Sequence, residues 1–194
     1  MDLRAAVLNE RLASYADLRG GYPFPLAGAI YWFALAGLGF AGLPLGRWIL
    51  CAAYGSGLIF PLAMLLGKLL RCDFIKRKTA VTSVLVPAFV AMFLFWPMAF
   101  AAWLTAPDLV PLIIAIGMSL HWPAIGWMYA RTALYAAHAV VRAGVCFGLW
   151  MVCPDHRFTL IPVAVGVIYV ITVIAILIDS AVVRRRIARA MPVL

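Results

Sequence analysis

The chain has 194 residues, of which 66% are apolar and 12% are charged, about half the charged share of a typical soluble domain. With 13% aromatic residues as well, this composition excludes an intrinsically disordered chain. The net charge of +9 comes from short basic clusters between long apolar stretches, which is typical of an integral membrane protein and not of a nucleic-acid-binding one.

The first element predicted along the chain is an amphipathic helix at residues 1–20. Leu8 and Leu12 belong to an apolar set that recurs at helical spacing, whereas Glu10 and Arg11 occupy other faces. A helix of this kind is expected to lie in the membrane interface, ahead of the first span. A frayed polar tail is the alternative.

Six apolar stretches follow, each about as long as a helix needs to be to cross the hydrocarbon core of a bilayer. The predicted spans are residues 22–43, 47–69, 80–104, 108–130, 132–153 and 158–183. The loops between them are short, so residues 1–194 are expected to form a single integral membrane domain. The predicted fold class is therefore an all-α polytopic transmembrane bundle.

The basic residues predict the orientation of these spans. With six spans, thirteen of the sixteen Lys and Arg residues fall on one side: Arg4, Arg11, Arg19, Lys68, Arg71, Lys76, Arg77, Lys78, Arg131, Arg184, Arg185, Arg186 and Arg189. Positive loops stay in the cytoplasm, so both termini are expected there. We also expect these clusters to contact anionic lipid head groups.

Three ionisable residues within the predicted spans are the main candidates for a functional site. Counting from Arg131 at the membrane boundary, His121 and Arg142 lie about 15–16 Å deep and His138 about 10 Å deep. His138 and Arg142 are four residues apart and share a helix face. Because the fourth and fifth spans are antiparallel neighbours, these three side chains are predicted to converge on one buried polar spot.

The stretch from Ser119 to Pro123 strengthens this prediction. Pro123 cannot donate to the Ser119 carbonyl and its ring clashes there, so a freed carbonyl and the Ser119 hydroxyl are expected beside His121. Trp122 is deep enough in the membrane to form a cavity wall. Asp179 on the last span is the one carboxylate expected within reach of Arg142; without that pair, Arg142 would need carbonyl groups, water or an anionic ligand.

Two further features leave the assembly open. Cys51 and Cys153 both fall near the outer surface, where an oxidising periplasm could pair them, or they are simply small apolar residues. Gly144 and Gly148 form a GxxxG motif, which brings helices close either within one chain or between two copies. A homo-oligomer is therefore a possible arrangement.

Two segments carry a family resemblance: GSGLIFPLAMLLGKLL at residues 55–70 and MSLHWPAIGWMYAR at residues 118–131. They resemble a group of uncharacterised bacterial six-helix membrane proteins of about the same length. The resemblance implies the bacterial cytoplasmic (inner) membrane as the location. It implies no activity, and it assigns no catalytic residue.

The favoured hypothesis is a small transporter or channel with a midplane polar site on the fourth to sixth spans, for a small anionic or proton-linked ligand. The alternatives are a structural or accessory membrane protein, in which the same residues only hold helices together, and a membrane enzyme or redox protein. The depth offset between His121 and His138 argues against paired haem ligation, and no CxxC, HExxH or GxSxG motif is present. No catalytic residue, metal or cofactor is expected.

Overall fold

The computed structural model describes residues 2–72 and 80–190, and every regular element in those two ranges is helical. The α-helices are α1 (Leu3–Asp17), α2 (Pro23–Phe40), α3 (Leu45–Gly57), α4 (Ile59–Leu69), α5 (Leu85–Phe93), α6 (Trp96–Thr105), α7 (Val110–Gly117), α8 (Trp122–Met128), α9 (Thr132–Val152) and α10 (Arg157–Ala190). Short 3-10 turns join some of them: η1 (Arg19–Gly21), η2 (Ala80–Val84), η3 (Pro107–Leu109) and η4 (Pro154–His156). The predicted all-α fold class is confirmed.

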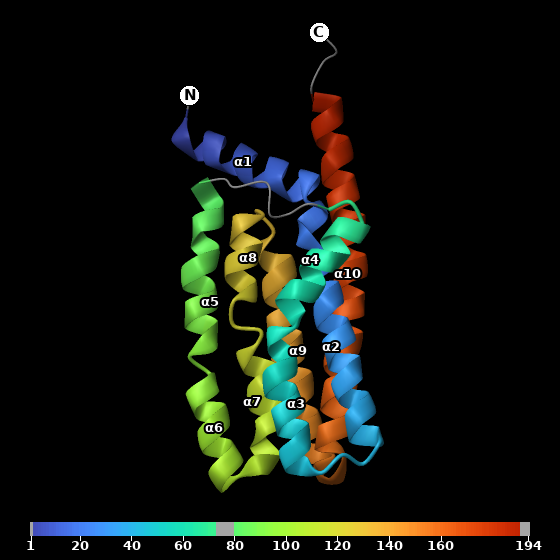
Figure 1. The fold of residues 1–194 in the computed structure, drawn as a ribbon. Helices are drawn as coiled ribbons and strands as arrows, with labels where there is room; N and C mark the ends of the chain where they lie inside the picture. The colour runs from blue at the N-terminus through green and yellow to red at the C-terminus, as the bar shows by residue number, and fades with distance from the viewer. Residues whose placement is uncertain (1, 73–79, 191–194) are drawn as a thin grey trace.

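The helices form an elongated bundle, and α1 lies across one end of it (Figure 1). The last turns of α10 are also found at this end, which we call the α1 end, whereas η3 and η4 lie at the opposite end. The longest helix, α10, has 34 residues and therefore rises about 51 Å. It packs along α2 and α9 and extends beyond α1, so its Arg184–Arg189 segment projects past the bundle. Lys76, Arg77 and Lys78 of the predicted basic loop lie outside the described residues.

Five helical stretches of the described chain are long and apolar enough to cross a membrane. They are Arg19–Phe40, Thr82–Thr105, Pro107–Met128, Thr132–Val152 and Pro154–Arg189. A sixth candidate is the pair α3 and α4, which meet at a bend of 47° and pass the same test together. This architecture is compatible with a multi-pass membrane protein.

Two predicted spans are interrupted at positions that proline chemistry explains. Proline lacks an N–H and its ring clashes with the carbonyl four residues earlier, so a helix tends to break there. α3 ends at Gly57, four residues before Pro61, and α5 ends at Phe93, four residues before Pro97. The predicted spans 47–69 and 80–104 are therefore broken helices and not continuous ones.

The third interruption separates α7 from α8 and surrounds Ser119, four residues before Pro123. The break occurs where the sequence predicted it, but the freed carbonyl predicted there is wrong. The Ser119 carbonyl accepts a hydrogen bond from the Trp122 N–H at 3.1 Å, in a tight turn. The Ser119 hydroxyl donates to the Ile116 carbonyl at 2.6 Å, so both groups are used locally.

The GxxxG motif does not bring two helices together within the described chain, and the predicted cysteine pair does not form a disulfide there. Gly144 and Gly148 are exposed on α9, and a Cβ added at either position would meet no described atom within 4 Å. Cys51 and Cys153 are both free thiols in the described chain, so they do not form the predicted pair. The GxxxG motif therefore faces away from the bundle, and the homo-oligomer stays a prediction.

Candidate ligand-binding site

The guanidinium of Arg142 lies in an aromatic cage in the middle of the bundle. Arg142 has no exposed surface, and its Nη1 donates to the Tyr169 hydroxyl at 3.0 Å. Its central carbon lies 5.0 Å from the ring centre of Trp32 and 5.2 Å from that of Tyr169. Cation–π attraction of this kind is worth about 2 kcal/mol or more when the cation is desolvated. The cage thus joins α9 to α2 and α10.

Most of the hydrogen-bonding capacity of Arg142 is nevertheless unused. Its Nε and Nη2 atoms are buried and have no hydrogen-bond partner among the described residues. The predicted pairing of Arg142 with Asp179 is wrong, because Asp179 bonds Arg131 instead. In the part of the chain that the structure describes, the positive charge of Arg142 is therefore met only by a neutral phenol and two aromatic faces.

His138 lies on the same face of α9 and is held from two sides. Its Nδ1 is 2.7 Å from the Thr172 hydroxyl of α10, and its ring stacks on Trp122 of α8 with centroids 3.7 Å apart and planes at 13°. The stacked rings of His138 and Trp122 both contact Tyr169 in an edge-to-face arrangement, and the ring centres of His138 and Tyr169 are 4.8 Å apart. The structure thus brings His138, Arg142 and Trp122 together around Tyr169.

His121 and Ser119 lie outside this cluster. His121 lies on the other side of Trp122, with ring centres 6.3 Å apart, and faces Phe89 of α5 at 5.0 Å. Its buried Nδ1 has no partner within the described ranges. Ser119 is 2% exposed and bonded to its own turn. Of the predicted site residues, His121 is therefore placed beside the cluster, and Ser119 is not directed into it.

A cavity of about 650 Å³ lies against this cluster. Its wall is mostly apolar and aromatic and comes from α2, α4, α5, α8 and the segment that follows α1. His121, Trp122 and Tyr169 line it, whereas Arg142 and His138 lie behind Trp122 and Tyr169. A mostly apolar cavity of this size with a few polar groups is the usual form of a small-molecule site.

The cavity has an opening at the side of the bundle and a second cavity next to it. Phe60 of α4 and Phe93 of α5 line it while each exposes more than half of its surface, so they stand at an opening on the side of the bundle. A second cavity of about 400 Å³ lies between α3 and α6 and shares Ser56 and Trp96 with the first. Together the two cavities follow the three broken helix pairs along much of the bundle.

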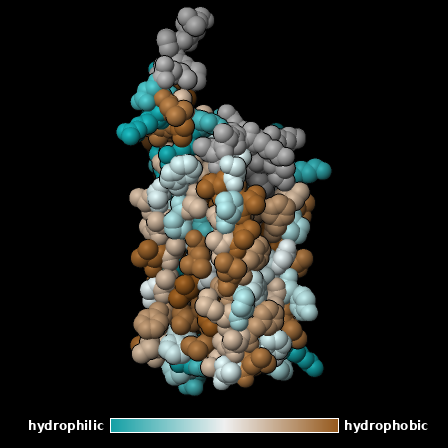
Figure 2. All heavy atoms as spheres, turned by 90° about the vertical axis from the view of Figure 1, so that its left-hand side faces the viewer, coloured by the Kyte–Doolittle hydropathy of each residue, from teal (hydrophilic) through white to brown (hydrophobic). Residues whose placement is uncertain are grey.

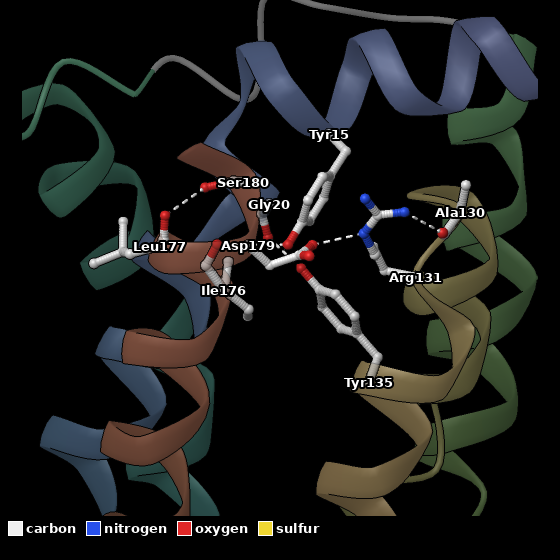
Figure 3. A network of polar contacts seen from close by, with 9 residues as sticks. All are labelled: Tyr15, Gly20, Ala130, Arg131, Tyr135, Ile176, Leu177, Asp179 and Ser180. Carbon is white, nitrogen blue, oxygen red and sulfur yellow. Dashed lines mark hydrogen bonds and ion pairs between the residues drawn. The ribbon is translucent and has the colours of Figure 1, made fainter. Parts of the chain in front are cut away.

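A separate polar network near the α1 end holds Asp179 (Figure 3). Arg131 Nε donates to the Asp179 carboxylate at 2.6 Å, and the Arg131 guanidinium lies 5.2 Å from the Tyr15 ring centre. The Tyr135 hydroxyl donates to the Gly20 carbonyl at 2.6 Å. Burial and the neighbouring Asp179 carboxylate raise the pKa of the Tyr15 hydroxyl well above its ordinary value, so it remains protonated. Asp179 therefore anchors α1 and does not belong to the Arg142 cluster.

The same network explains how the chain turns from α1 into α2. Gly20 and Gly21 both adopt φ of 64°, in the left-handed region that glycine enters without cost. A Cβ at Gly20 would also collide with Ile176 and Tyr15. At this end Gly20 and Gly21 form part of the cavity wall. The turn and its hydrogen bond from Tyr135 thus close the cavity beneath α1.

Sequence reasoning missed Tyr169 and Thr172, although a signal was present. Tyr169 and Thr172 are three residues apart on the last helix and face His138 and Arg142, which are four apart on an antiparallel neighbour. Matching the polar positions of the two helices in reverse order would have paired Thr172 with His138 and Tyr169 with Arg142. The depth of Trp32 in its span indicates packing or a cavity wall, but no pattern in the sequence pairs it with Arg142.

Comparison with known proteins gives a family but no activity. The family model described as "Family of unknown function (DUF7010)" matches residues 9–179, well over half of the chain. No curated protein and no solved structure matches the chain. The predicted kinship with uncharacterised proteins is thereby confirmed, and no site residue is transferred by it. The chain belongs to the DUF7010 family of unknown function.

Proposed function

We propose that this protein is a small transporter of the bacterial cytoplasmic membrane that binds an organic molecule in the cavity beside Tyr169 and His121. The observation that carries the proposal is the cavity of about 650 Å³ set against a buried cation without a carboxylate partner among the described residues. A protein that only needed to hold its helices together would fill such a space, because native interiors are close-packed. A cavity retained beside a charge is better suited to a ligand.

The shape of the bundle supports movement of that ligand as well as binding. The two cavities share the wall residues Ser56 and Trp96, so they lie next to each other along the bundle. Their walls come largely from α3–α4, α5–α6 and α7–α8, whose helices are broken. Broken helices deep in a membrane are tolerated where they are buried in protein or line a cavity.

The proposal includes six spans with both termini in the cytoplasm. It counts the bent pair α3–α4 as one span, which runs between the two ends of the bundle (Figure 1). Most of the described basic residues then belong to the α1 end, including those of α1 and of the last turns of α10. Both the charge distribution and the apolar flank of the bundle (Figure 2) support this placement.

Mass spectrometry of molecules that co-purify with the protein tests the proposal. The protein is extracted with its surrounding lipid, and the bound small molecules of wild type are compared with those of Ser56→Trp, which fills the junction of the two cavities. Ala137→Phe, an enlargement of an exposed residue on α9, is the matched control. We expect a molecule that is enriched with wild type and Ala137→Phe and lost from Ser56→Trp. Proteoliposomes loaded with it should release it through wild type and Ala137→Phe but not through Ser56→Trp.

Identical small-molecule content in all three proteins would overturn the proposal. The buried polar residues would then be assigned to the alternative function, a structural membrane protein. One observation favours that second candidate: the Arg142 cage joins α2, α9 and α10, and its contacts would hold these helices without any ligand.

A further inference from the structure

We infer that the cavity binds a single-chain amphiphile with an anionic head group, which enters from the side of the bundle between α4 and α5. This inference rests on the proposed function, since it names the class of molecule that the cavity holds. It draws on three observations. Arg142 is a buried cation without a carboxylate partner among the described residues, the Tyr169 hydroxyl connects Arg142 to the cavity wall, and the opening between α4 and α5 is apolar.

The buried cation favours a negative ligand. Arg142 is fully buried, and no carboxylate of the described chain lies against its guanidinium. In a low-dielectric interior, an uncompensated charge interacts strongly with any opposite charge nearby. Tyr31, His121, His138 and Cys146 are the other titratable groups around Arg142, and none of them is a carboxylate. An anion in the cavity would therefore be the first opposite charge that Arg142 meets.

Tyr169 transmits this preference to the cavity wall. Its hydroxyl oxygen accepts a hydrogen bond from Arg142, which leaves the phenolic proton to be donated elsewhere. No described residue accepts that proton, and Tyr169 lines the cavity. A phenol that accepts from a cation is a stronger donor, because neighbouring hydrogen bonds polarise one another. We therefore place the anionic head of the ligand at Tyr169, with the unpartnered Nδ1 of His121 in the same cavity wall.

The remaining wall fits an apolar chain. It is formed largely by Leu, Ile, Met and Phe side chains, and Phe24 and Phe60 contact each other with ring centres 5.6 Å apart. At the opening, Phe60 is 53% and Phe93 is 56% exposed. Figure 2 shows the α5–α6 flank of the bundle, where apolar side chains cover the middle and most hydrophilic ones gather toward the ends. The opening itself lies between α4 and α5, where the exposed rings of Phe60 and Phe93 make its rim apolar, so an amphiphile can reach the cavity from lipid without passing through water.

Binding of three amphiphiles with one chain length tests the inference. Protein in nanodiscs of zwitterionic lipid is titrated with radiolabelled palmitate, and the bound label is displaced with palmitate, cetyl alcohol or cetyltrimethylammonium. Empty nanodiscs and Ser56→Trp measure the label held by lipid alone. We expect saturable palmitate binding that is about tenfold or more tighter than binding of the alcohol, as a hydrogen bond to a charged group implies. Cetyltrimethylammonium should displace least.

Variants then locate the head group. Tyr169→Phe removes the donor and should weaken palmitate binding about tenfold or more while leaving the alcohol nearly unaffected. Equal displacement by all three amphiphiles in wild type would overturn the anionic head, whatever the variants do. Absence of saturable binding would overturn the amphiphile class. In both cases the co-purification experiment still decides the proposed function, because it makes no assumption about the ligand.

Discussion

His138 donates its Nδ1 proton to Thr172, across the contact between α9 and α10. The two atoms are 2.7 Å apart, and the Thr172 hydroxyl is itself 2.7 Å from the Ile168 carbonyl, to which it must give its single proton. The histidine is consequently the donor, so the neutral ring carries its proton on Nδ1. Its Nε2 is then a bare acceptor, buried and without a partner in the described chain.

Replacing Thr172 by Val should destabilise the protein more than removing both members of the pair. Thr172→Val leaves the His138 N–H buried and unsatisfied, at a cost of about 1–3 kcal/mol. The double variant with His138→Phe removes that donor and should recover much of the loss. Thr105→Val is the control, since Thr105 bonds the carbonyl four residues earlier but no histidine. Denaturation in detergent compares wild type, the two single variants Thr172→Val and His138→Phe, the double variant and the control; additive losses would contradict the hydrogen bond between His138 and Thr172.

Replacing Arg142 by Met should leave the fold intact. Arg142 has no carboxylate partner in the described chain, so its removal strands no opposite charge. The lost cation–π attraction, about 2 kcal/mol, is opposed by the desolvation cost that the variant no longer bears. We expect near-normal yield and a melting temperature close to that of wild type. Arg142→Glu, which places an unmatched anion there, serves as the comparison, and aggregation of the Met variant would show that the cage holds the bundle together.

Replacing Tyr135 by Phe should loosen the connection between α1 and the bundle. The variant leaves the buried Gly20 carbonyl without its hydrogen bond from Tyr135, a cost of about 1–3 kcal/mol. Hydrogen exchange should accelerate in α1 and η1 and remain unchanged in α9. Tyr54→Phe removes a hydroxyl from a side chain that is 78% exposed and should change nothing. Unaltered exchange in α1 would mean that this bond does not hold the turn.

High pH should weaken the folded state through Tyr15. Its pKa is raised in the folded protein, chiefly by burial, so below about pH 10 the hydroxyl is neutral in both folded and unfolded chains. Above that pH the unfolded chain loses the proton and the folded one keeps it, so stability falls as pH rises. Denaturation at pH values on either side of 10 should show a smaller alkaline loss for Tyr15→Phe than for wild type. An equal loss in both would assign the effect to other groups.

Reporter fusions test the orientation. Fusions after Arg131 and Arg189 are expected to report the cytoplasm, and fusions near Asp108 and Asp155 the periplasm, because basic residues concentrate at the α1 end. A periplasmic signal after Arg131 would mean that the chain does not cross the membrane between η3 and α9.

Hydropathy and charge were sufficient to predict the helical elements, because long apolar runs allow few alternatives in a membrane. The extent of the helices was harder to predict: α10 continues to Ala190, past the predicted end at 183, since a run of arginines is compatible with helix once it leaves the apolar layer. The breaks before Pro61 and Pro97 follow the same rule that predicted the one before Pro123. An interruption at Pro61 is indicated by the sequence, whereas the break before Pro97 was missed because apolar length alone was considered there.

The candidate site was only half predictable. Depth along a helix placed Arg142 and His138 together, but depth does not give the direction in which a side chain points. Depth alone therefore predicts Asp179 as the partner of Arg142, whereas Asp179 lies with Arg131 and Tyr15 near the α1 end. The contact of Trp32 with Arg142 depends on how α2 packs against α9, which no local pattern encodes.

The bundle combines two mechanically different kinds of helix. α2, α9 and α10 each run without a break, whereas the three helix pairs between α3 and α8 are interrupted. An interruption before a proline already lacks a backbone hydrogen bond, so it bends at lower free-energy cost than an intact helix. Because these pairs form most of the cavity walls, the cavity can change its shape by rotation at existing hinges, without melting any helix and without disturbing the continuous three that hold Arg142.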